Sequence, residues 1–320
     1  MEGRVKHDAV LLIGFGGPNC SEEIRPFLAQ VLRGRSVPPG RIEEVTRHYE
    51  RMGGKSPYNE LTFRQARGLE KILTREGPSL PVYVGMKNWE PFFEETLEKM
   101  MRDGAERALG IILAPHQGEA SWGRYQAALR EARVEVSGRL EKEAPIVEYC
   151  GPWHTHPLFV EAAVDKLRCK IDKINLSRKD AIKFCFTAHS VPVSLAHPYV
   201  DQILETCQAV AQEAGILEWE LIYQSRSGNP LDLWLEPDVC EVIRQAARTG
   251  WKNIVLNPIG FVCDHVEVLY DLDVEARQVA EDLGLGYYRI CTVNDHPSFL
   301  RMLADVVRRS QEEPGRAVGQ

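Results

Sequence analysis

The sequence predicts an α/β protein in which parallel strands lie buried between helices. Short, almost wholly apolar runs alternate along the chain with longer stretches whose apolar residues recur at helical spacing. Strands buried on both faces of a parallel sheet have this composition, and regular strand–helix alternation is typical of a doubly wound sheet. The length of 320 residues predicts two domains of moderate size.

The runs expected to form strands are rich in aliphatic and aromatic residues and are bounded by turn residues or charges. They are 9–13, 82–84, 108–113, 145–149, 182–187, 220–223, 254–257 and 287–290. Helices are expected at 21–32, 40–51, 59–75, 92–102, 121–136, 157–172, 200–214, 239–248, 265–282 and 297–310. Helices therefore separate successive strands, which is the connection that parallel strands require.

A faint internal repeat favours two similar lobes. Segments 103–115 and 249–258 each read as a helix end, an apolar strand and a proline at the carboxyl end of the strand. Their spacings differ, so chance similarity stays an alternative. We place the boundary between the lobes near Cys150-Gly-Pro152.

The composition is that of an ordinary globular protein, with 44% hydrophobic and 27% charged residues. A formal charge of −7 and the lack of a basic run argue against nucleic acid as a partner. No apolar stretch reaches the length of a membrane helix. We therefore expect a cytoplasmic protein with no integral membrane segment.

The eight cysteines are scattered without a C-x-x-C pair, so buried thiols are expected and an iron–sulfur cluster is not. The turn Gly14-Phe-Gly-Gly-Pro18 lacks the spacing of a dinucleotide-binding or phosphate-binding loop, so no nucleotide is expected. This turn is either only tight, or it lets the backbone approach a flat ligand.

The segment 260–275 holds the clearest signal of a functional site. In the helix predicted there, Asp264, Glu267 and Asp271 fall at spacings of three and four and would share one face. Like charges at these spacings repel each other, so the arrangement favours the passage of a metal ion or a proton along the helix.

His189 directly follows the apolar strand 182–187, where the ligand sites of open α/β sheets lie. A single histidine is more often structural, but with the acidic segment it predicts a site for a divalent metal or a proton. His265 is either a supporting group or merely the first residue of the helix. The loops 48–57 and 224–237 are further candidates, the first for an anionic group or only a helix stop.

Taken together, these motifs resemble the ferrochelatase family, whose members insert ferrous iron into a porphyrin. The resemblance rests on 11–18, Tyr49 with 53–57, 186–192, 224–228 with Trp234, and 260–273. It implies two Rossmann-like lobes, each a doubly wound parallel sheet, with a porphyrin cleft between them. One lobe would hold residues 1–151 plus 296–320, with a returning C-terminal helix, and the other residues 152–295.

The resemblance also implies the site residues. His189 and Glu267 would be the catalytic and metal-binding pair, and which is the base and which the iron ligand stays open. Asp264, Asp271 and Glu275 would form a track for protons or iron. The porphyrin would contact Phe15, His48, Tyr49, Ser56, Lys87, Trp89 and Tyr125. Fe(II) would be a substrate, and we expect a monomer.

Segments 85–91 and 113–117 are similar to the soluble branch that uses coproporphyrin III. Phe15 stands where that branch has a tyrosine able to bind the product iron, and Asn88 where it often has a histidine. Protoporphyrin IX therefore stays an alternative substrate. The chain could also be a tetrapyrrole or metal carrier without turnover, or a chelatase for another metal or tetrapyrrole.

Overall fold

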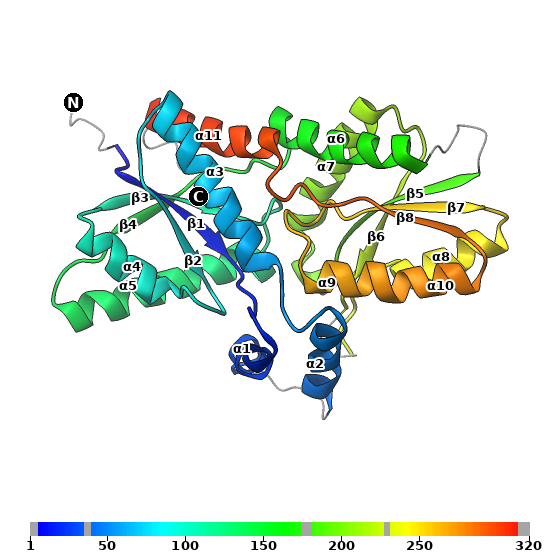
Figure 1. The fold of residues 1–320 in the computed structure, drawn as a ribbon, viewed down its shortest axis with the longest axis horizontal. Helices are drawn as coiled ribbons and strands as arrows, with labels where there is room; N and C mark the ends of the chain where they lie inside the picture. The colour runs from blue at the N-terminus through cyan, green and yellow to red at the C-terminus, as the bar shows by residue number, and fades with distance from the viewer. Residues whose placement is uncertain (1–5, 35–39, 175–180, 227–230, 313–320) are drawn as a thin grey trace.

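Two four-stranded parallel sheets form the frame of the molecule (Figure 1). The computed structural model describes residues 6–34, 40–174, 181–226 and 231–312. The strand orders are β2-β1-β3-β4 and β6-β5-β7-β8. The strands are β1 (Ala9–Gly14), β2 (Val82–Met86), β3 (Arg107–Ile112), β4 (Ile146–Tyr149), β5 (Ile182–His189), β6 (Glu220–Gln224), β7 (Asn253–Asn257) and β8 (Gly286–Arg289). Every strand predicted from the sequence is present.

Helices cover both faces of the sheets (Figure 1). They are α1 (Ile24–Val31), α2 (Arg41–Arg51), α3 (Tyr58–Glu76), α4 (Phe93–Arg102), α5 (Arg124–Leu140), α6 (Pro157–Ile174), α7 (Tyr199–Ala214), α8 (Val239–Arg248), α9 (Val266–Val268), α10 (Arg277–Asp282) and α11 (Pro297–Glu312). Short 3₁₀-helices occur at η1 (Ser21–Glu23) and η3 (Val193–Leu195), and π-helices at η2 (Glu119–Gly123) and η4 (Leu269–Ala276). Within the described ranges, no helix combines the length and apolar character of a membrane span.

The two lobes share one apolar core. A single cluster of buried side chains runs from Leu109 in the first sheet to Phe186 in the second. Three aromatic rings in this cluster pack against one another. The centroids of Trp153 and Phe159 are 5.2 Å apart, and those of Phe159 and Phe299 are 6.1 Å apart. Helix α11 follows the last strand of the second sheet and packs against both α3 and α6 (Figure 1). The boundaries at 151–152 and 295–296 stay a prediction.

The predicted helix 265–282 differs from the observed one in its start and its type. His265 is extended (φ −98°, ψ 176°), so the helix begins at Val266. From Leu269 to Ala276 it is a π-helix, and α10 continues it. The prediction that Asp264 shares a helix face with Glu267 was therefore wrong, because Asp264 lies in the turn before the helix.

Gly260 makes room for the carboxyl end of β5. A Cβ atom on Gly260 would lie 2.8 Å from Cα of Ala188, the residue before His189. We expect Gly260→Ala to lower the free energy of unfolding by about 1–3 kcal/mol, because the backbone of β5 would have to shift. Urea denaturation measures this loss.

Gly138 in α5 is the matched control, because no atom of the described residues lies within 4 Å of its Cβ position. Gly138→Ala should raise the free energy of unfolding by about 0.5–1 kcal/mol, since alanine restricts the unfolded chain. Equal unfolding free energies for the two variants would contradict a close approach at Gly260.

Candidate active site

His189 is the last residue of β5, and its hydrogen bond fixes which ring nitrogen is free. Nδ1 lies 2.5 Å from the carbonyl oxygen of Ser190. A carbonyl only accepts, so the neutral ring carries its hydrogen on Nδ1 and keeps a lone pair on Nε2. Ser190 is itself fixed, because its N–H donates to the carbonyl of Gln224 at 2.8 Å and its hydroxyl donates to the carbonyl of Leu235 at 3.0 Å. The end of β5 therefore presents an oriented base or metal ligand.

Nε2 of His189 faces the carboxylate of Glu267, the second residue of α9. The distance from Nε2 to Oε2 is 3.8 Å, which is too long for a hydrogen bond. This spacing suits two ligands of one divalent ion. If each ligand atom lies about 2.1 Å from the ion, the two ligand atoms are at most about 4.2 Å apart. The side chains are 29% and 47% exposed, so both are accessible. This pair can take up protons or hold a metal ion.

Two buried tyrosines from the first lobe lie near Glu267. Burial raises the pKa of Tyr49 in α2 and of Tyr125 in α5, and the charge of Glu267 raises both further. Both phenols are therefore neutral at physiological pH. Burial lowers the pKa of His265, whose ring packs edge-on against Phe261 with centroids 4.9 Å apart. Glu267 thus lies at the junction of the lobes among neutral aromatic groups.

Glu267, Asp271 and Glu275 form an acidic row along α9 and η4. Burial raises the pKa of Asp271 to about 7. The hydroxyl of Ser225, which donates to the carboxylate of Asp271, opposes this rise, whereas the negative charges of Glu267 and Glu275 add to it. Burial also raises the pKa of Glu275, and the charge of Glu44 in α2 adds to that rise. A carboxyl group with a pKa near 7 gains and loses protons readily at neutral pH.

Asp264 does not belong to this row. Its carboxylate accepts hydrogen bonds from Nη1 of Arg289 and Nδ2 of Asn294, both at 2.8 Å, and from the backbone N–H of Thr292 at 3.2 Å. Arg289 also pairs with Asp273 at 2.7 Å. A carboxylate held by these donors fixes the turn before α9.

Phe15 follows β1 and is held by the backbone around it. Its N–H donates to the hydroxyl of Tyr58 at 2.9 Å, and its carbonyl accepts from Nδ2 of Asn88 at 3.1 Å. Asn88 is buried and therefore serves the turn at Phe15. The next residue, Gly16, has φ +88°, and a Cβ there would lie 2.9 Å from the backbone nitrogen of Trp89. Glycine is thus required at this position by both conformation and space.

The remaining predicted porphyrin contacts are in different environments. His48 stacks on Tyr270 with ring centroids 3.6 Å apart, and burial lowers its pKa, so it is a neutral ring at the junction of the lobes. Lys87 is partly exposed and donates to Oδ1 of Asn88 at 3.4 Å. Ser56 is buried, and its hydroxyl accepts from the N–H of Tyr58 at the start of α3.

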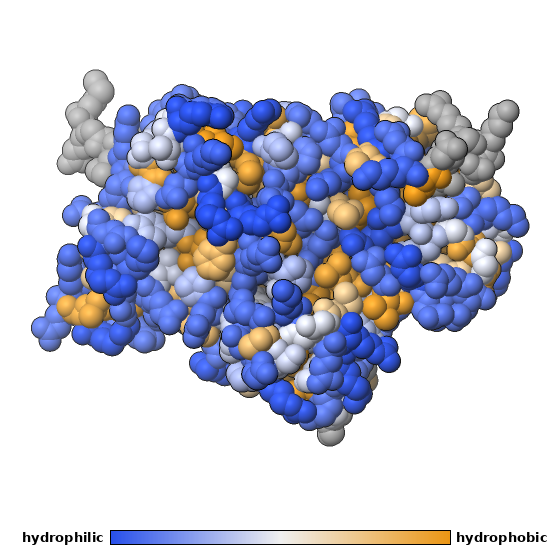
Figure 2. Space-filling view, in the orientation of Figure 1, coloured by the Kyte–Doolittle hydropathy of each residue, from blue (hydrophilic) through white to orange (hydrophobic). Residues whose placement is uncertain are grey.

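Helices α1 and α2 pack against the helix that carries the acidic row. Phe27 and Tyr49 form one buried cluster with Val266 and Tyr270. Trp89 joins it, with its ring 6.0 Å from that of Phe27. Figure 2 shows hydrophobic residues gathered over α9, next to α2, on an otherwise largely hydrophilic face. Apolar side chains of the first lobe therefore pack against the helix that carries Glu267.

Residues beyond the predicted site residues also support this site. Gln224 ends β6 and Ser225 follows it, and both donate to the carboxylate of Asp271. Tyr270 stacks on His48, and Tyr58 anchors Phe15. Gln224 and Ser225 lie in the candidate loop 224–237 that the sequence indicated, whereas the stacking of Tyr270 depends on the tertiary packing. Residues 227–230 of the predicted loop lie outside the described ranges.

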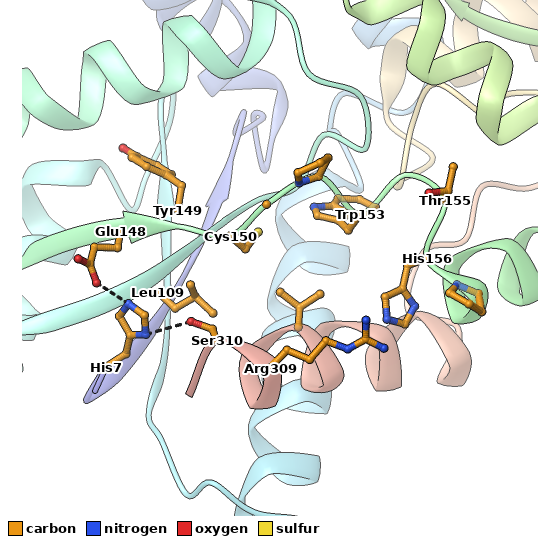
Figure 3. Close-up of a pocket in the computed structure, with 14 residues that line it drawn as sticks. His7, Leu109, Glu148, Tyr149, Cys150, Trp153, Thr155, His156, Arg309 and Ser310 are labelled. Carbon is orange, nitrogen blue, oxygen red and sulfur yellow. Dashed lines mark hydrogen bonds and ion pairs between the residues drawn. The ribbon is translucent and has the colours of Figure 1, made fainter. Parts of the chain in front are cut away.

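Two pockets lie away from the His189–Glu267 pair. One, of about 390 Å³, lies between β4 and α11 (Figure 3). Its polar groups pair with each other or with neighbours, since His7 bonds to Glu148 at 2.9 Å and Ser310 at 3.1 Å, and His156 bonds to Asp305 at 2.8 Å. The other, of about 400 Å³, lies over β2. Among the described residues, no three His, Cys, Asp or Glu side chains come together as a metal site.

Comparison with known proteins gives consistent matches over almost the whole chain. The ferrochelatase family profile matches residues 7–311. The ferrochelatase of Rhodopirellula baltica is 38% identical over 305 residues, which cover 94% of this chain and 86% of that protein. The coproporphyrin III ferrochelatase of Nocardia farcinica is 37% identical, covering 94% of this chain and 87% of that protein. The protein of the same description from Mycobacterium avium is 39% identical, covering 98% and 91%.

Among solved structures, the sirohydrochlorin chelatase SirB from Bacillus subtilis subspecies spizizenii, in complex with cobalt, superposes with a TM-score of 0.58. The match covers 98% of this chain and 99% of that chain at 13% sequence identity. At this identity the likeness shows the two-lobed α/β fold alone.

The raised pKa of Asp271 predicts a pH-dependent effect on stability. A folded-state pKa of about 7 means that the folded protein holds this proton more tightly than the unfolded chain does. The contribution of the Asp271 carboxyl group to the free energy of unfolding is fully present below the ordinary aspartate pKa of about 3.9. It is lost as the pH rises to about 7. Asparagine does not titrate, so Asp271→Asn should gain stability relative to the wild type between about pH 4 and pH 8.

Urea denaturation across this pH range measures the difference. Asp172→Asn, at an exposed position on α6, is the control and should show no such trend. A difference between Asp271→Asn and the wild type that stays constant with pH would contradict the buried, protonated carboxyl group.

Proposed function

The chain belongs to the ferrochelatase family, and we propose that it inserts Fe(II) into a porphyrin by means of the His189–Glu267 pair. The observation that carries the proposal is the free Nε2 lone pair of His189 at 3.8 Å from the carboxylate of Glu267. Insertion requires acceptors for two pyrrole protons and a transient ligand for the metal. In this pair, one group would take the first proton, and the other would hold the iron and take the second proton once the iron has passed to the ring nitrogens. The reaction belongs to haem biosynthesis, and the relatives favour coproporphyrin III as substrate.

The chemistry assigns alternative tasks to the two groups. A free porphyrin loses two N–H protons as the iron enters, and a planar ring shields its nitrogen lone pairs. Bending the bound ring would expose these lone pairs, a form of ground-state distortion. Either His189 takes a pyrrole proton and Glu267 guides the iron, or the roles are reversed. In both cases one proton acceptor and one metal ligand lie on the same side of the ring.

The acidic row would connect this pair with solvent. Asp271 has a pKa of about 7, so it can accept a proton and release it again near neutral pH. Glu275 continues the row toward α2. Protons leaving the ring, or iron approaching it, would follow these carboxylates. Asp264, paired with Arg289, supports the start of α9 instead.

The first lobe would supply the binding surface for the macrocycle. Phe15, Trp89 and Tyr125 offer aromatic contact, and Tyr49, His48 and Lys87 would meet the carboxylate groups of the substrate. Ser56 is the weakest candidate, because its buried hydroxyl serves α3. Phe15 offers no ligand to iron, so we expect the product to leave without an axial bond from this position.

The remaining parts of the proposal concern class and context. We assign the activity to the metal-inserting lyases and place the protein in the cytoplasm as a monomer. The absence of a resident iron–sulfur cluster and of a nucleotide stays a prediction. The lobes are proposed as residues 1–151 plus 296–320 and residues 152–295.

An anaerobic insertion assay tests the function. Fe(II) is offered with coproporphyrin III and, separately, with protoporphyrin IX, and the formation of the metallated product is followed by absorbance. We expect turnover, faster with coproporphyrin III. Tight porphyrin binding without turnover of either substrate would favour a carrier, and turnover with Co(II) but not Fe(II) would favour another chelatase.

Variants of the pair test its role. His189→Ala and Glu267→Gln should each lower kcat at least about 100-fold, because each removes a proton acceptor or metal ligand. Both side chains are partly exposed, so the free energy of unfolding should change by less than about 1 kcal/mol. Activity near that of the wild type in either variant would remove that residue from the mechanism.

Matched controls separate these effects from a general loss of charge. His197, with a side chain 86% exposed, and Glu281, 56% exposed, lie outside the site. His197→Ala and Glu281→Gln should leave insertion unchanged. Unfolding of His189→Ala would instead identify His189 as a structural residue.

A further inference from the structure

The peptide unit between His189 and Ser190 is held at both of its polar ends. Its N–H, from Ser190, donates to the carbonyl of Gln224 at 2.8 Å. Its carbonyl, from His189, accepts from the hydroxyl of Tyr199 at 3.2 Å. A peptide unit is planar, so these two bonds fix its orientation. The carbonyl of Ser190 in turn accepts from Nδ1 of His189, and the direction of the imidazole therefore depends on this backbone.

Tyr199 is suited to act as the donor in this contact. It is the first residue of α7 and is partly buried, and burial raises the pKa of its phenol. A carbonyl oxygen can only accept, so the hydroxyl is the donor in this contact. The bond therefore connects α7 to the end of β5.

The position of Tyr199 depends on a seam between the loop after β3 and α7. The ring of His116 lies edge-on to that of Tyr199, with centroids 6.2 Å apart, and its Nε2 lies 3.0 Å from Oγ1 of Thr206. The N–H of Gln117 donates to Oε1 of Gln202 at 2.7 Å, and Nε2 of Gln202 donates back to Oε1 of Gln117 at 3.0 Å. The loop leaves the first sheet and α7 packs on the second, so the seam joins the lobes.

We propose that Tyr199 is a positioning residue that holds the imidazole of His189 in its reactive orientation, and that the seam of His116, Gln117, Gln202 and Thr206 makes this orientation depend on the contact between the lobes. The inference rests on the proposed insertion reaction, in which His189 acts through Nε2. Tyr199 does not touch the reacting atoms and acts through the peptide unit that follows His189.

Loss of the Tyr199 hydroxyl would free one end of this peptide unit. The plane could then rotate about its remaining bond to Gln224, and the carbonyl of Ser190 would move relative to Nδ1 of His189. The hydrogen could then reside on Nε2. An imidazole in that form can neither accept a proton nor bind a metal through Nε2.

Tyr199→Phe tests the proposal, because it removes the hydroxyl and keeps the ring against His116. We expect kcat for insertion of Fe(II) into coproporphyrin III to fall about 10-fold, with KM changed by less than about twofold. Nitrogen-15 NMR of histidine-labelled protein should show a mixture of His189 tautomers in place of the single Nδ1–H form. An unchanged kcat together with an unchanged tautomer would overturn the proposal.

Tyr149→Phe is the matched control, because Tyr149 is also partly buried but lies on β4. It should leave kcat and the His189 signals as in the wild type. An equal loss of kcat in both variants would show a general effect of removing a phenol, and would contradict the specific role of Tyr199.

The seam is tested separately by Gln202→Glu, which replaces the donor Nε2 with an oxygen facing Oε1 of Gln117. We expect kcat to fall less in Gln202→Glu than in Tyr199→Phe. In the double variant, the loss of transition-state stabilisation should be less than the sum of the losses in the two single variants. Additive effects would contradict the link between seam and imidazole. If the wild type inserts no iron, the proposed function fails, while the NMR comparison still decides the positioning of His189.

Discussion

The hydrogen bond from Nδ1 of His189 to the carbonyl of Ser190 determines what the site can do. A carbonyl oxygen cannot donate, so this bond leaves the lone pair on Nε2 and directs it toward Glu267. Without it, the same two residues would still lie near each other but would not form an oriented acceptor and ligand. The bond exists because β5 ends at His189 and because β6 holds the next residue through Gln224. The sheet thus sets the chemistry of the imidazole through its backbone.

Charge is distributed around this pair in a way that separates structural from functional acids. Asp264 and Asp273 neutralise the buried Arg289 and fix the entry and middle of the acidic helix. Among the residues that the structure describes, no cation pairs with Asp271 in this way, and burial raises its pKa to about 7. Its neighbours Glu267 and Glu275 are exposed. On the same helix, Asp273 is therefore paired with Arg289, whereas burial raises the pKa of Asp271.

Much of this arrangement could be predicted from the sequence, because it depends on local pattern. Apolar runs predicted the strands, and the position of His189 after such a run predicted its place at the carboxyl end of a sheet. Spacing brought Glu267 and Asp271 together. The partner of Asp264 could not be predicted, since Arg289 lies on a strand distant in the sequence. Tertiary packing likewise determines three further features: the π-helical turns, the hydrogen bond of Ser56 to Tyr58, and the contact from Tyr199 to His189.

A crystal structure of the protein with bound coproporphyrin III would test the account most directly. We expect the four pyrrole nitrogens to lie beside the His189–Glu267 pair, with Nε2 directed at the ring, Nδ1 still bonded to Ser190, and Phe15 and Tyr125 in contact with the macrocycle. A porphyrin bound elsewhere, such as in the pocket between β4 and α11, or an imidazole with Nδ1 facing the ring, would contradict it.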